Sequence, residues 1–190
     1  GYGRAFSVTS NARICTGDGL ALAFNAGLPL EDMEMVQFHP SGMYGKGFLV
    51  SEASRGEGAF LLNGKDERFM KKYAPQTMEL ASRDVIARAI ETEILQGRGA
   101  GKKKDHVWLD LRHLGEKTIE ERIPEIRKTV HEQLGIDCTK ERIPILPTAH
   151  YSMGGIPTDT RTRVVVDERN TPVPGLFAAG ECEYQYHGAN

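Results

Sequence analysis

The residues of this sequence that could carry chemistry are two histidines, two arginines and a glutamate, spread over four short segments. Imidazole and guanidinium groups donate hydrogen bonds to carboxylates, and a guanidinium can donate two parallel ones. These residue types therefore suit the binding of a small acid. The residues are His39, Glu52, Arg55, Arg83 and His150.

Each of these residues also has an ordinary structural explanation when it is taken alone. His39 precedes a proline of fixed φ and could simply bond a carbonyl at a strand end. Glu52 and Arg55 could form a surface ion pair, which contributes roughly 0–1 kcal/mol. Arg83 could extend along a helix surface into water, and the glycines that follow His150 could simply form a turn.

The elements that must position these residues follow from hydrophobic periodicity and from the places of glycine and proline. Ile86, Ile90 and Ile94 recur every four residues after Ser82, which predicts a helix that is capped by Ser82 and ends near Gly97. The same patterns predict several other elements. These are helices over 18–26 and 124–134, a strand over 33–38 broken by Pro40, strands over 48–50, 107–111 and 164–166, and a buried strand over 175–181.

Composition and charge exclude several classes of protein. The net charge is −2 and there is no basic stripe, so nucleic-acid binding is not indicated. No stretch approaches the roughly 18 consecutive apolar residues of a membrane span. Three widely spaced cysteines without a CxxC pair argue against a disulfide framework or a zinc site, and they fit a reducing compartment.

Three familiar motifs fail on inspection. The Gly17-Asp18-Gly19 segment lacks the third glycine or alanine of a dinucleotide fingerprint, because residue 22 is leucine. Residues 97–104 resemble a phosphate-binding loop, but Lys103 stands where serine or threonine is required. The remaining histidines show no metal-ligand spacing, so no metal site is expected.

Taken together and in order, the motifs resemble the succinate dehydrogenase/fumarate reductase flavoprotein family. The resemblance runs essentially end to end, and five or six ordered motifs make it specific. The matching segments are residues 16–19, 37–42, 51–58, 67–70, 80–84, 150–155, 174–181 and 187–190.

The resemblance implies an α+β capping domain inserted in an α/β FAD-binding domain of the glutathione-reductase type, of which only part is present. Residues 43–146 would be the capping domain, a lid over a dicarboxylate, and residues 1–42 and 147–190 would be FAD-domain segments. The cofactor would be FAD. Because the chain opens without methionine and lacks the family's upstream glycine-rich turn, we expect an internal fragment that is inactive and does not retain FAD when isolated.

The resemblance also assigns roles to individual residues. Arg83 would be the catalytic proton-transfer residue, with Glu52 and Arg55 as its relay to solvent. Four residues would bind the substrate and two would contact FAD. The substrate-binding residues would be His39, Ser51, Glu52 and His150, and the FAD contacts would be Asp18 and Glu181. The family usually has threonine at position 51, but serine keeps the hydroxyl.

The implied reaction is the interconversion of succinate and fumarate by hydride transfer to FAD and proton transfer through Arg83. An L-aspartate oxidase shares most of these motifs, although such enzymes tend to have proline where Ser82 stands. A non-catalytic capping-domain module is a further alternative. The resemblance implies an iron–sulfur subunit and membrane-anchor subunits as partners, which would hold the protein peripherally at the cytoplasmic face of the inner membrane.

Overall fold

The computed structural model describes residues 1–184, which divide into two compact units. One unit comprises residues 39–148, and we call it the 39–148 unit. The other combines residues 1–38 with those from 149 onward, and we call it the flanking unit. The sequence places the capping domain at 43–146, and the identity of the 39–148 unit as a lid remains a prediction. The motif expected at residues 187–190 lies outside the described residues.

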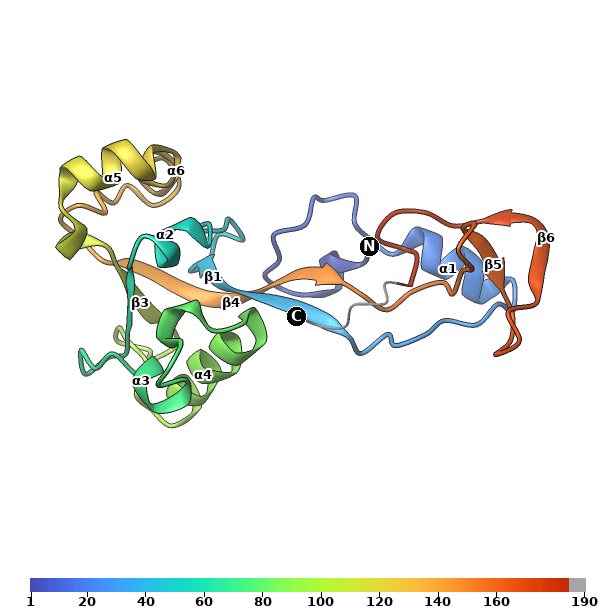
Figure 1. The fold of residues 1–190 in the computed structure, drawn as a ribbon, viewed down its shortest axis with the longest axis horizontal. Coiled ribbons are helices and arrows are strands. Elements are labelled where there is room, and N and C mark those ends of the chain that lie inside the picture. Colours follow the sequence, from blue (N-terminus) through green and yellow to red (C-terminus); the bar gives the residue numbers. More distant parts are fainter. Residues whose placement is uncertain (185–190) are drawn as a thin grey trace. The chain divides into compact units, whose positions relative to one another are not determined.

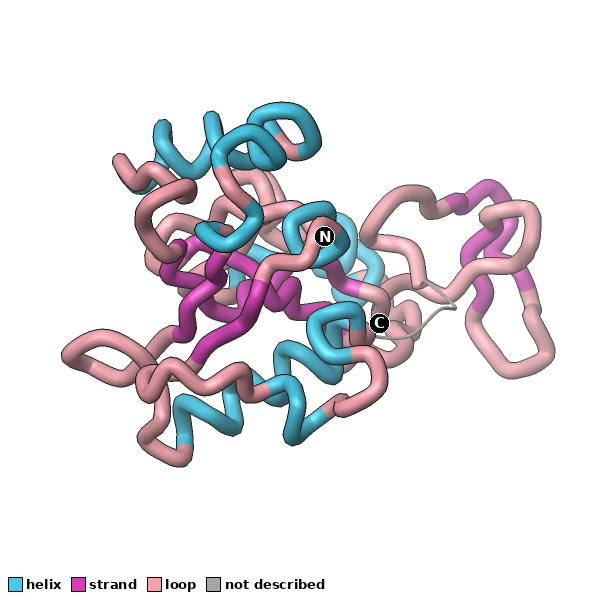
Figure 2. Tube along the Cα trace, turned by 60° about the vertical axis from the view of Figure 1, so that its left-hand side comes forward, coloured by secondary structure: helices cyan, strands magenta, loops and turns pink. Residues whose placement is uncertain are grey.

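The 39–148 unit contains a sheet with helices on two sides. In both ribbon and tube views, α5 and α6 lie on one side of the sheet and α3 and α4 lie on the other (Figures 1 and 2). The helices are α2 (Ala53–Gly56), α3 (Met70–Tyr73), α4 (Arg83–Leu95), α5 (Glu116–Arg122) and α6 (Pro124–Leu134), with 3-10 turns η2 (Met78–Leu80) and η3 (Arg112–Leu114). The strands β2 (Phe60–Leu62) and β3 (Val107–Asp110) lie wholly within this unit. The strands β1 (Val36–Met43) and β4 (Ile143–Ser152) complete the sheet, and each has residues in both units.

The sheet has the order β1-β4-β3-β2, and β3 pairs antiparallel with both of its neighbours. Leu109 faces Leu61 on β2 and Ile143 on β4. The prediction that Pro40 ends the first strand is wrong, because β1 continues through it to Met43. The physical reason is that β1 lies at the edge of the sheet, where a residue without an N–H can face away from the ladder.

The two long predicted helices are confirmed. The first is α4, and Gly97 follows it in a left-handed conformation with φ +72°. The second is α6, which Pro124 opens and Gly135 closes. Ser82 does occupy the position before α4, but its hydroxyl donates to the side chain of Asp84 (2.6 Å) instead of accepting from the helix backbone.

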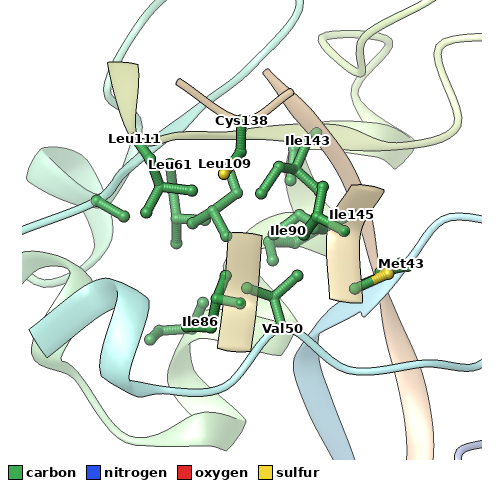
Figure 3. Close-up of a cluster of buried hydrophobic side chains, with 14 of the residues drawn as sticks. Met43, Val50, Leu61, Ile86, Ile90, Leu109, Leu111, Cys138, Ile143 and Ile145 are labelled. Carbon is green, nitrogen blue, oxygen red and sulfur yellow. The ribbon is translucent and has the colours of Figure 1, made fainter. Parts of the chain in front are cut away.

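The core of the 39–148 unit is a single apolar cluster between the sheet and its helices (Figure 3). Ile86 and Ile90 of α4 meet Leu109 and Ile145 of the sheet there, all fully buried. Val50 joins this core from an irregular segment, since the predicted strand over 48–50 is reduced to a single bridge between Leu49 and Gly42. This packing fixes the start of α4, where Arg83 lies.

The flanking unit has a smaller core and more exposed apolar side chains. Its elements are the 3-10 turn η1 (Gly3–Ala5), α1 (Asp18–Asn25), and the antiparallel strands β5 (Arg163–Val165) and β6 (Pro172–Phe177). The predicted buried strand over 175–181 is wrong, because β6 ends at Phe177 and that side chain is 61% exposed. The reason is that this two-stranded sheet has no second layer over Phe177 among the described residues.

Within residues 1–184, no helix is both long and apolar enough to cross a membrane.

Candidate active site

His39 is held in β1 with its ring oriented by the backbone. It is 3% exposed, and its Nδ1 accepts a hydrogen bond from the backbone N–H of Ser41 at 3.2 Å. An imidazole that accepts at Nδ1 carries its proton on Nε2 when neutral. His39 can therefore donate a hydrogen bond from Nε2, as the binding of a carboxylate requires.

Ser51 and Glu52 lie at the start of the short helix α2. The Oγ of Ser51 accepts from the backbone N–H of Ala53 at 3.3 Å, so the hydroxyl caps this turn. The hydroxyl of Ser54 donates to the carbonyl of Ser51 at 2.8 Å, which tightens the turn further. Ser51 is exposed and keeps its own O–H for donation to another group.

Two arginines converge on one oxygen of Glu52. The Nε of Arg83 donates to Glu52 Oε1 at 2.7 Å, and Nη2 of Arg55 donates to the same oxygen at 3.1 Å. We call Arg83, Glu52 and Arg55 the Glu52 cluster. Arg55 is 4% exposed. Its contact with Glu52 is therefore not the simple surface ion pair that the sequence alone also allowed. Arg83 is likewise tied to α2 across 31 residues of sequence.

The charges in the Glu52 cluster shift one another. The hydrogen bond from Arg83 holds the pKa of Glu52 below its ordinary value, and a charge on His39 would act in the same direction. Glu52 therefore stays ionised at neutral pH. Burial lowers the pKa of Arg55, although Glu52 opposes that effect. The cluster thus places a buried guanidinium and an ionised carboxylate in direct contact.

Arg55 is held by Glu79, which the sequence did not single out, and Glu79 is held in turn by Arg68, which lies in the matching segment 67–70 but was given no role. The Nη1 of Arg55 donates to the backbone carbonyl of Glu79 at 2.7 Å. The carboxylate of Glu79 in turn receives two bonds from Arg68, at 2.8 and 2.6 Å. No local pattern could have indicated these contacts, because the partners lie on separate turns and meet only through the fold.

His150 belongs to the flanking unit. Its Nδ1 lies 2.6 Å from the hydroxyl of Ser10, and its backbone carbonyl accepts from Asn11. The contact with Ser10 orients the ring, and Ser10 is a third residue to which sequence reasoning gave no role. The structure thus brings His39 and Glu52 close to the two arginines in one unit, while the approach of His150 to them stays a prediction.

The glycines after His150 have a structural explanation. A Cβ on Gly154 would lie 2.1 Å from the carbonyl oxygen of Asp32, and one on Gly155 would lie 2.4 Å from that of Cys182. Such distances are impossible for any residue with a side chain. Both glycines are therefore required where backbone passes backbone within the flanking unit, and this accounts for them without a ligand.

The two residues expected to contact a cofactor also lie in the flanking unit. Asp18 opens α1 and its Oδ2 accepts from the hydroxyl of Thr16 at 2.8 Å. The Oε1 of Glu181 accepts from the backbone N–H of Ser152 at 2.9 Å. Both carboxylates thus have fixed orientations. Among residues 1–184 there is no group of three His, Cys, Asp or Glu side chains arranged to bind a metal.

Comparison with known sequences shows close relatives along the whole chain. A family described as FAD binding domain matches residues 1–190. The mitochondrial succinate dehydrogenase flavoprotein subunit of Oryza sativa subsp. japonica is 53% identical; all of this chain and 31% of that subunit are covered. The 8-methylmenaquinol:fumarate reductase flavoprotein subunit of Wolinella succinogenes is 48% identical, with 100% and 30% covered. The chain spans about a third of the length of these curated relatives.

Solved structures agree with the sequence comparison. A variant of the E. coli quinol fumarate reductase subunit FrdA matches with a TM-score of 0.89 and 42% identity, over all of this chain and 34% of that one. A quinol–fumarate reductase with menaquinol molecules matches with a TM-score of 0.87 and 40% identity, over 100% and 35%. The fold of the chain is thus that of the matched third of these fumarate reductase chains.

Proposed function

We propose a function from the premise that this chain belongs to the FAD binding domain family, which matches all of it. The chain is part of the flavoprotein subunit of a succinate dehydrogenase or fumarate reductase, and it carries residues that interconvert succinate and fumarate. The observation that supports this most is the Glu52 cluster beside His39, because it combines carboxylate-binding donors with groups able to move a proton. The 53% identity to a succinate dehydrogenase flavoprotein subunit supports succinate as the substrate.

The substrate is a small acid with a carboxylate at each end, and it needs hydrogen-bond donors at both. His39 donates from Nε2, Ser51 donates from its hydroxyl, and Glu52 orients the arginine at the same wall. The family resemblance assigns a further imidazole, that of His150, to the same substrate. Rigid binding of both ends places one carbon of the substrate for reaction, which is the main contribution of such positioning residues.

Arg83 gives a proton to the substrate carbon during fumarate reduction and takes it back during succinate oxidation. An arginine normally keeps its charge, since its pKa lies above about 12. It can therefore act only if it passes one proton on as another arrives. Glu52 and Arg55 provide this path, and their shared contact at Glu52 Oε1 supports it.

FAD is the cofactor of this proposal, and the described residues suit it. A Cβ on Gly19 would lie 3.3 Å from the Cβ of Cys182, so the segments that carry Asp18 and Glu181 pack against each other. Carboxylates accept hydrogen bonds from hydroxyl groups, which FAD has on its ribityl and ribose parts. Asp18 and Glu181 would hold the cofactor. When bound, FAD accepts or returns the hydride of the reaction.

The finer architecture follows the same proposal. Residues 43–146 form a capping domain inserted in an FAD-binding domain of the glutathione-reductase type. The 39–148 unit supports this, because it has its own core and carries the whole Glu52 cluster. Closure of such a lid would exclude water from the site.

The partners are an iron–sulfur subunit and membrane-anchor subunits, which hold the complex at the cytoplasmic face of the inner membrane. The similarity to a quinol–fumarate reductase with menaquinol molecules supports an assembly that meets a membrane quinol. The 190-residue chain alone, about a third of its relatives' length, should neither retain FAD nor turn over succinate.

The test is to assay the full-length subunit in its complex with succinate, fumarate and L-aspartate. We expect turnover of the two C4 acids and none of L-aspartate. Oxidation of L-aspartate would favour the oxidase alternative, and a flavin-containing complex inactive on all three would favour a non-catalytic module and contradict the proposal.

A further inference from the structure

We propose that the ion pair between Arg68 and the buried carboxylate of Glu79 positions Arg55, and through it the proton path of the Glu52 cluster. The inference rests on the function proposed above. It makes Arg68 and Glu79 positioning residues, because neither contacts the groups assigned to the substrate.

Arg55 depends on few contacts for its place. Its guanidinium donates to the carbonyl oxygen of Glu79 (2.7 Å) and to Glu52 Oε1 (3.1 Å). The Nε of Arg55 has no hydrogen-bond partner among the described residues, although the side chain is buried. A small displacement of the Glu79 carbonyl would therefore change the angle at which Arg55 meets Glu52.

The carboxylate of Glu79 fixes that carbonyl by tying its turn to the sheet. Oε1 accepts from the backbone N–H of Leu61 in β2 at 3.2 Å and from Arg68 Nε at 2.8 Å. Oε2 accepts from Arg68 Nη2 at 2.6 Å. The guanidinium of Arg68 also lies 4.1 Å from the centre of the Phe60 ring, which holds the arginine itself in place.

The turn needs this restraint. Met78, the residue before Glu79, has φ +50°, a left-handed conformation that is strained for a residue with a Cβ. A cavity of about 210 Å³ adjoins the turn and is lined by Arg55, Arg68, Met78 and Glu79 among others. Without the ion pair, Met78 could relax from its left-handed conformation and the turn could move into this cavity. The carbonyl of Glu79, which holds Arg55, would then shift.

The chain offers a matched control in the same unit. Glu93 pairs with Arg98 in the same bidentate geometry, at 2.8 and 2.6 Å, and Glu93 is equally buried. This pair makes no hydrogen bond to Arg55 among those between described residues. Glu79→Gln and Glu93→Gln therefore remove the same charge from the same kind of pair, with only the first connected to the proton path.

The experiment measures kcat, KM for succinate, flavin per subunit and the solvent deuterium isotope effect on kcat, in the full-length subunit within its complex. For Glu79→Gln we expect kcat per flavin to fall about tenfold, because proton return through Arg55 becomes slower. The isotope effect should rise while KM stays within about twofold of wild type, since the substrate-binding donors are unchanged. Glu93→Gln should keep the wild-type kcat per flavin and isotope effect.

Two results would overturn the inference. One is a Glu79→Gln enzyme with wild-type kcat and isotope effect; the other is a loss per flavin shared equally by Glu79→Gln and Glu93→Gln. If Glu79→Gln fails to bind flavin, Arg68→Lys decides in the same assay, because lysine keeps the charge but not the paired bonds. A wild-type complex without succinate or fumarate activity would instead contradict the proposed function itself.

Discussion

The two ends of helix α4 carry charged clusters of opposite character. Arg83, at its start, joins the Glu52 cluster, in which two arginines share one oxygen of a half-exposed glutamate. Glu93, near its end, is 1% exposed and each of its oxygens accepts two hydrogen bonds. The donors are Arg98, Tyr73 and Asn63, and with Glu93 we call them the Glu93 cluster.

The two carboxylates differ in how exposed they are and in how completely their oxygens are hydrogen-bonded. In the Glu93 cluster each carboxylate oxygen already accepts two hydrogen bonds, so neither has an acceptor site left for a ligand. The geometry therefore indicates a structural role. In the Glu52 cluster the carboxylate is half exposed and two arginines bond the same oxygen, which supports the proposed role in proton exchange. The following changes test whether the two clusters are as distinct as their geometry indicates.

The largest expected effect is on turnover, from Arg83→Lys in the full-length enzyme. We expect kcat to fall about 10³-fold. A guanidinium can bond Glu52 with one nitrogen while another faces the substrate carbon, whereas the single nitrogen of an ammonium cannot do both. KM for succinate should change little, and the melting temperature should stay near that of wild type. Steady-state succinate oxidation measures this, and unchanged turnover would remove Arg83 from the mechanism.

The opposite result is expected for Glu93→Gln. This change breaks a buried ion pair, for which we expect a loss of about 3 kcal/mol in the free energy of unfolding. Arg98 is partly exposed and can regain water, so the loss should lie at the lower end of the usual range. Chemical denaturation measures the loss, and kcat at 25 °C is the control; a variant as stable as wild type would show that the cluster is not structural.

The acid dependence of stability sharpens the comparison. Burial alone would raise the pKa of Glu93, but its bonds from Arg98, Asn63 and Tyr73 lower it to about 2. A carboxylate whose pKa is lower in the folded state stabilises the fold fully above its ordinary pKa of 4.5. This stability should be lost as the pH falls from about 4.5 towards 2, and Glu93→Gln should flatten that part of the curve in denaturation measured at several pH values.

The smallest effect is expected from a third pair on the same helix. Arg88 bonds Asp84 one turn away, but its side chain is 71% exposed. Arg88→Ala should change the free energy of unfolding by less than about 0.5 kcal/mol. The reason is that an exposed ion pair is only slightly more stable than the same two charges separately hydrated. A loss approaching that of Glu93→Gln would show that burial is not what distinguishes the two clusters.

Local sequence patterns predicted the long helices of the 39–148 unit well. The isoleucine stripe of α4 and the proline and glycine that bound α6 act within one or two turns, so no tertiary contact is needed to read them. The predictions failed where the outcome depended on a neighbour. Pro40 lies within a strand because that strand is at the edge of its sheet, and Phe177 is exposed because none of residues 1–184 forms a second layer over it.

The candidate site divides in the same way. The order of motifs in the sequence singles out His39, Glu52, Arg55 and Arg83, and their roles remain predictions. Ser10 and Glu79 were missed, and Arg68 was given no role although it lies in the matching segment 67–70, because a serine or an ordinary ion pair carries no local signature. Their importance lies in the partner that each contacts, and those partners are distant in the sequence.

The sequence by itself determined the helices, the family resemblance and the residue types available for binding a dicarboxylate. Only the tertiary structure decided which charged side chains meet, which of them are buried, and that one glutamate oxygen serves two arginines. The physical reason is that periodicity and capping are set by neighbours along the chain. The position, pKa and satisfaction of a charge are set instead by groups that the packed core brings together from far apart.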